Sequence, residues 1–146
     1  MTLNQSLKQK SRMAGELVRL QAILQRENAR KSDSVSTVNR QEVWDKIIKT
    51  SNDLGELKGR ITIANIGIYP VLESMSELKS RIAFINNLPK KAGTEVEPTY
   101  GNQERITYTW DSFISQEKAD ELVANLQLEI NQNQDLVDQY NSSTNI

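Results

Sequence analysis

The feature that most constrains this chain is a run of apolar and small residues spaced four and three positions apart. It comprises Val43, Ile47, Thr50, Leu54, Leu57, Ile61 and Ala64. This spacing keeps all seven on one side of a helix for three heptads, which predicts a long helical hairpin or coiled coil. Trp44 and Ile48 lie beside this seam and widen it. A wider apolar stripe can bury against more than one neighbour, so we expect a second subunit to cover these two side chains.

Three other segments carry similar spacing. The sequence predicts helices at about residues 3–29, 41–66, 70–87 and 112–141. Gly67 is expected to end the second helix in the left-handed conformation, and Asp111 to cap the start of the last one. Asn133 occupies a seam position of the last helix, where it either fixes the register of a subunit contact or lies in solvent.

Between the third and fourth helices the pattern changes to period two. In the stretch Arg105–Trp110, Ile106, Tyr108 and Trp110 alternate with polar residues, which predicts a strand. The expected partner is Glu95–Thr99, with Pro98 restricting it to an edge and a turn at Tyr100–Asn102. A β-hairpin at about residues 95–110 is marginal alone, so we expect it to pack on the helices or on another subunit.

These elements predict a single, mainly α domain over residues 1–146, built from long antiparallel helical hairpins with heptad seams plus one short β-hairpin. Hydrophobic residues make up 37% of the chain and aromatic residues 5%. Such a modest apolar fraction is typical of long helices with one buried stripe. The whole chain is therefore expected to form a homo-oligomer.

Catalysis is not expected. The chain has no cysteine and no histidine, which removes thiol nucleophiles, zinc thiolate sites and the commonest general base. No carboxylate pair has the spacing of a metal or glycosidase site, and no phosphate-binding glycine motif is present. We therefore predict no enzyme activity, no metal and no cofactor.

Charge and hydropathy limit the partners. The net charge is −1, whereas a protein that binds nucleic acid usually carries a basic excess. No run of 18 apolar residues and no apolar leader segment are seen, so a membrane partner is not expected and the cytoplasm, of a bacterium or of an infected host cell, is the expected location.

Candidate binding residues fall into three groups. Arg105, Tyr108 and Trp110 could stack a base and hold a phosphate; alternatively, the two aromatic rings pack the hairpin on the helices. Two further pairs either contribute to a pocket or only cap helix ends: Arg60 with Asn65, and Asn141 with Thr144.

The pattern resembles the septicolysin-like family of small uncharacterised bacterial proteins. The matching stretches are RITIAN at 60–65, ERITYT at 104–109 and NSSTNI at 141–146. Ser142 stands where the family usually has Trp, and Ser76 falls where an Asp is expected. The resemblance implies a long helical hairpin, a middle helix, an extended Arg-aromatic segment and a last helix, and it carries over no activity.

Two functions fit these observations. The first is a non-enzymatic homo-oligomer that sequesters a small nucleotide-like ligand at subunit interfaces, in the manner of a phage sponge that counters bacterial immune signalling. The second is a structural or protein-interaction helical scaffold with no small-molecule ligand. The Arg-aromatic strand favours the first, because a scaffold does not need it.

Overall fold

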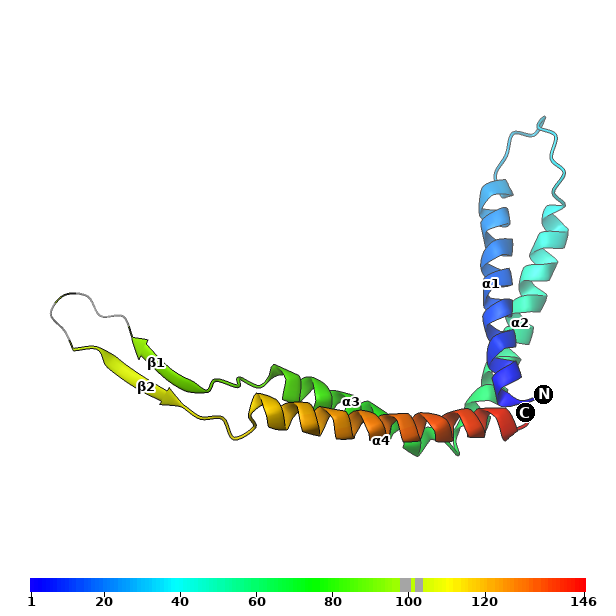
Figure 1. Cartoon of the computed structure of the whole chain (residues 1–146). Helices are drawn as coiled ribbons and strands as arrows, with labels where there is room; N and C mark the ends of the chain where they lie inside the picture. The colour runs from blue at the N-terminus through cyan, green and yellow to red at the C-terminus, as the bar shows by residue number, and fades with distance from the viewer. Residues whose placement is uncertain (98–100, 102–103) are drawn as a thin grey trace. The chain divides into compact units, whose positions relative to one another are not determined.

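The computed structural model describes residues 1–97, 101 and 104–146, and within these it contains four helices and one antiparallel pair of strands (Figure 1). In chain order these elements are α1 (Leu3–Glu27), α2 (Arg40–Asn65), α3 (Tyr69–Asn87), β1 (Gly93–Glu97), β2 (Ile106–Trp110) and α4 (Gln116–Ser143). The expected mainly helical fold with one small hairpin of strands is confirmed, and each predicted helix boundary lies within four residues of the observed one.

The chain divides into two compact units. The first contains Met1–Tyr69 together with Asp138–Ile146, and the second contains Pro70–Val137. The prediction of a single domain stays a prediction.

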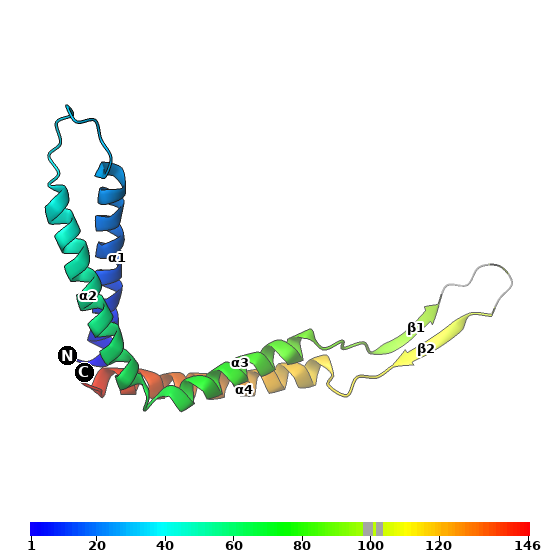
Figure 2. The same cartoon turned by 180° about the vertical axis from the view of Figure 1, so that it is seen from behind.

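The first unit is built on the α1–α2 hairpin, whose two helices lie side by side in both views (Figures 1 and 2). The buried side chains of α2 are Ile47, Leu54, Leu57 and Ile61, all of them members of the run from Val43 to Ala64. Leu57 and Ile61 pack with Leu3 of α1, which is fully buried. Burial of this side of α2 leaves Trp44 and Ile48 49% and 43% exposed.

Local polar groups set the ends of α1 and α2. The Thr2 hydroxyl accepts a hydrogen bond from the Gln5 amide at 3.2 Å, and the Gln5 side chain accepts one from the Thr2 amide at 2.9 Å. This reciprocal pair satisfies two amides that the first turn leaves without partners. Asn39 caps α2 through the Glu42 amide at 3.1 Å. The guanidinium of Arg40 donates to the Asn28 carbonyl at 3.0 Å, at the end of α1, where positive charge complements the helix dipole.

Gly67 follows α2, but not for the reason that the sequence suggested. Among the described residues, positive φ values occur at Gly93 and Gly101 and not at Gly67, so the predicted left-handed ending is wrong. Glycine is required here by a close approach. A Cβ at this position would lie 2.5 Å from the hydroxyl oxygen of Tyr140, which donates to the Ala64 carbonyl at 2.8 Å.

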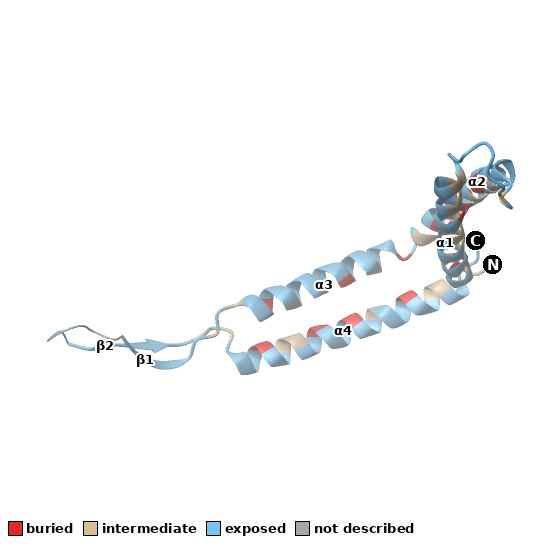
Figure 3. Cartoon of the chain, turned by 90° about the horizontal axis from the view of Figure 1, so that it is seen from above, coloured by how far each residue is buried: buried red, intermediate tan, exposed pale blue. Residues whose placement is uncertain are grey.

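In the second unit, the buried positions of α3 and of the greater part of α4 lie on the sides of the two ribbons that face each other (Figure 3). The buried residues of this unit are Met75, Leu78 and Ile85 on α3 and Ala119, Leu126, Ile130 and Val137 on α4. The predicted cap at Asp111 is wrong. The hydroxyl of Ser115 accepts from the Lys118 amide at 3.2 Å, so α4 begins at Gln116. The residues from Asp111 to Ser115 instead form the connection from β2.

The β-hairpin pairs Gly93 with Trp110 and Glu97 with Ile106 in antiparallel register. The predicted alternation of β2 is confirmed, while β1 begins two residues earlier than expected. All ten strand residues are exposed, so the expectation that the hairpin packs on the chain's own helices is wrong. Pro98, Thr99 and the expected turn residues Tyr100 and Asn102 lie outside the described residues.

Candidate functional site

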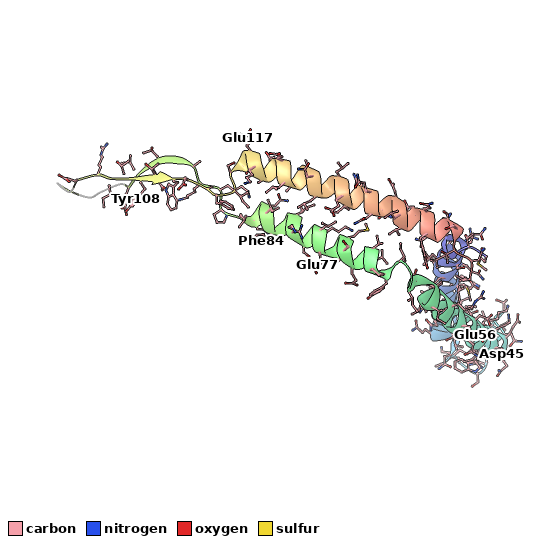
Figure 4. All side chains as sticks on the ribbon, turned by 90° about the horizontal axis from the view of Figure 1, so that it is seen from below. Asp45, Glu56, Glu77, Phe84, Tyr108 and Glu117 are labelled. Carbon is pink, nitrogen blue, oxygen red and sulfur yellow. The ribbon has the colours of Figure 1, made fainter. Side chains whose placement is uncertain are left out.

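The site that was expected to bind a base and a phosphate lies on the aromatic face of the β-hairpin. Tyr108 and Trp110 share one face of β2 and are 45% and 43% exposed (Figure 4 labels Tyr108). The Tyr108 hydroxyl donates to a Glu97 carboxylate oxygen at 3.0 Å, and the Trp110 indole nitrogen donates to Glu95 at 2.9 Å. The polar edges of both rings are therefore occupied by carboxylates from β1.

The electrostatics of this face follow from those two carboxylates. The hydrogen bond from Tyr108 to Glu97, aided by the negative charge of Glu97, raises the pKa of the Tyr108 hydroxyl above its usual value of 10.0. Carboxylates that disfavour the negatively charged phenolate would also repel a bound phosphate, because like charges repel. Arg105, just before β2, is exposed. Of the three predicted residues, Tyr108 and Trp110 share one face of the hairpin, and their neighbours on that face are the acidic residues Glu95 and Glu97.

The base of the hairpin forms a mostly apolar hollow of about 340 Å³ that is open to solvent. The Lys91 ammonium lies 4.6 Å from the centre of the Trp110 ring and 3.3 Å from a Glu95 oxygen. The Ser112 hydroxyl donates to the Lys91 carbonyl at 2.6 Å. The lining residues are Leu88, Pro89, Lys91 and Trp110 through Ile114. Lys91 therefore contacts both the Trp110 ring and Glu95, and its charge is paired with that carboxylate.

The other predicted residues lie in the first unit, where they belong to different surroundings. Arg60 lines a shallow hollow of about 230 Å³ beside Asp53 and Glu56, whose labelled side chain lies on α2 (Figure 4). Asn65 and Asn141 are half-buried. The Asn141 side-chain oxygen is buried with no hydrogen-bond partner among the described residues. Acidic neighbours give the Arg60 hollow no preference for an anion.

Thr144 belongs to a joint between the two ends of the chain. The Leu3 amide donates to the Thr144 carbonyl at 2.7 Å, and the Ile146 amide donates to the Met1 carbonyl at 3.0 Å. Thr2 and Asn145 form an antiparallel bridge. Thr144 thus acts through its backbone in a structural contact. The sequence pattern did not reveal this joint, because backbone pairing of two chain ends leaves no periodic signal.

A groove near the loop end of the α1–α2 hairpin, where α1 ends and α2 begins, was not predicted. It has a volume of about 590 Å³ and combines the half-exposed Trp44 ring with side-chain amides. Its lining residues are Gln21, Leu24, Gln25, Asn28, Trp44 and Ile47. Arg40 and Gln41 line an adjoining hollow. Gln21, Gln25 and Asn28 are spaced four and three apart, a polar pattern that the spacing of the apolar residues of α1 does not reveal.

Within the described residues, no group of three or more acidic side chains is placed to hold a metal ion. In the same part of the chain, no helix is both long enough and apolar enough to cross a membrane. Comparisons with family models, curated proteins and solved structures find no match to this chain. The resemblance to the septicolysin-like family therefore stays a prediction.

Proposed function

We propose that this chain is a non-enzymatic, self-associating helical protein-interaction module. The supporting observation is the number of large apolar side chains that its regular helices leave in solvent. Ile63 and Ile66 at the end of α2 are 71% and 68% exposed, Phe84 of α3 is 63% exposed, and Leu128 of α4 is 58% exposed. Contiguous apolar surface marks interaction sites more often than it marks free surface, and Ile63 and Ile66 are only three residues apart at the end of α2.

The contacts within the β-hairpin also favour a protein-interaction module over a nucleotide-binding protein. Glu97 and Glu95 of β1 accept hydrogen bonds from Tyr108 and Trp110, so carboxylates lie beside the rings where a phosphate would bind. A helical module that recognises protein does not require a free cationic site.

The test of this proposal is the mass of the purified wild-type protein in solution. Static light scattering across a wide range of concentration should give a defined multiple of the 16.6 kDa chain mass. A single-chain mass at every concentration would remove self-association from the proposal.

Sequestration of a nucleotide-like ligand, as by a phage sponge, is a second candidate, and the groove beside Trp44 favours it. A half-exposed indole can stack a planar base, and the neighbouring amides of Gln21, Gln25 and Asn28 offer donors and acceptors to the edge of that base. The cavity volume falls within the usual range for small-molecule sites.

Calorimetric titration with cyclic nucleotides and ADP-ribose-type nucleotides tests this candidate, with the Trp44→Ala variant as its control. Binding that disappears in the variant, followed by recovery of the intact nucleotide after denaturation, is the expected result. If none of these compounds gives a heat of binding, nucleotide sequestration is ruled out as the function.

A further inference from the structure

We propose that the exposed stripe of α2 is the contact between two copies of this chain, which cross at Gly55. This inference rests on the proposed self-association and names its surface. The α2 stripe is defined by seven residues: Trp44, Ile48, Ser51, Gly55, Gly59, Thr62 and Ile66. All seven are exposed in the single chain.

The α2 stripe is distinct from the side of α2 that packs on α1. At about 100° per residue, its members lie roughly a third of a turn from Leu54, Leu57 and Ile61, which are buried against α1. The stripe contains no charged residue. The charges of α2 lie outside it, at Arg40, Glu42, Asp45, Lys46, Lys49, Asp53, Glu56, Lys58 and Arg60. A helix this rich in charge that keeps one exposed arc uncharged has a composition suited to burial.

The centre of the α2 stripe is unusual for exposed helix. Glycine is among the poorest helix formers, yet Gly55 and Gly59 stand in the middle of α2. A Cβ at either position would meet no atom within 4 Å, so no contact with the part of the chain that the structure describes requires glycine there. A second helix that approaches closely at this point does require small residues, because side chains set the distance between packed helices.

The order of residues in the α2 stripe identifies the occupant as a second copy. Counting outward from Gly55, the steps are four, three and four in both directions. A two-fold axis at Gly55 therefore sets Ser51 against the partner's Gly59 and Ile48 against the partner's Thr62. It also sets Trp44 against the partner's Ile66. Two-fold contacts are self-complementary in this sense, and crossing helices need small residues at the crossing and larger ones toward the ends.

The chain as a whole exposes more surface than compact units of its mass would. It exposes 11,075 Å², whereas two separate compact units of half its mass would together expose about 9,100 Å². A standard protein–protein interface needs about 800 Å² from each partner, which is less than this excess of roughly 1,900 Å² over the whole chain.

The test compares two glutamate substitutions by light scattering and circular dichroism on the full-length protein. Gly55→Glu places two carboxylates near each other at the proposed axis, and like charges at an interface are strongly unfavourable. Dimer affinity should fall on the order of a hundredfold, with helix content unchanged or higher. Gly15→Glu is the matched control, because Gly15 is also an exposed glycine within a long helix with no atom within 4 Å of a Cβ. This control should remain dimeric.

Ser51→Glu is a second stripe variant that keeps the proposal testable if Gly55→Glu does not fold, and it should also dissociate. A wild-type monomer would overturn the proposed self-association itself. A wild-type dimer that survives both stripe substitutions would overturn this inference alone. Equal dissociation by Gly15→Glu would also overturn it, since the contact would then not be specific to the α2 stripe.

Discussion

Replacing Gly67 with alanine is expected to destabilise the protein by about 2 kcal/mol, although alanine usually stabilises a position with negative φ. The new Cβ would lie 2.5 Å from the Tyr140 hydroxyl oxygen and 3.1 Å from the adjoining ring carbon. To relieve this overlap the hydroxyl must leave the Ala64 carbonyl, to which it donates at 2.8 Å.

The magnitude is a balance of opposing terms. Loss of the hydrogen bond costs about 1 kcal/mol, and overpacking in a close contact costs about 1–3 kcal/mol. Restriction of the unfolded chain by alanine offsets about 0.4–1 kcal/mol. The net loss should lower the melting temperature by about 4–8 °C.

Thermal unfolding followed by circular dichroism measures this change, with Gly15→Ala as the control. No atom lies within 4 Å of a Cβ at Gly15, so this variant should be as stable as the wild type or more stable. In a Tyr140→Phe background, Gly67→Ala should cost less, because the closest atom has been removed. A Gly67→Ala protein at least as stable as the wild type would refute the argument from close approach.

Two further predictions concern the hairpin and the start of α1. The hydrogen bond to Glu97 raises the pKa of Tyr108 above 10.0, so its stabilising effect is present below pH 10 and is lost as the pH rises through the raised pKa; Glu97→Gln should return the pKa toward 10.0. Ultraviolet titration of the wild type against Tyr108→Phe measures this value, and titration at or below pH 10 would contradict it. Thr2→Ala removes the hydroxyl that caps the Gln5 amide and should cost about 1 kcal/mol, whereas Thr2→Ser should cost little; equal melting temperatures for the alanine and serine variants would argue against this capping role.

The helices could be predicted because burial on one side of a helix leaves a periodic record. Leu54, Leu57 and Ile61 are spaced as that record requires, and they are buried. The ends of the elements were harder to predict. Asp111 and Ser115 are both good caps, and only the backbone path beyond β2 decides that Ser115 is used.

The candidate site was predicted less well, since residue type alone does not give the charge of a neighbour. Tyr108 and Trp110 were expected beside a phosphate, but the pairing of β1 with β2 brings Glu95 and Glu97 to them. Gly67 shows the same limit. Its role depends on Tyr140, more than seventy residues away in the sequence, and no local pattern links the two.

The central claim is that two copies meet at Gly55, and a cysteine at that position tests it most directly. The chain contains no cysteine, so Gly55→Cys carries one thiol. Two copies crossing at this residue would bring their Cα atoms close to the separation of about 4.4–6.8 Å that a disulfide spans. Mild oxidation should convert Gly55→Cys into a covalent dimer at low protein concentration, while Gly15→Cys stays a single chain. Equal and slow cross-linking of both variants would contradict the claim.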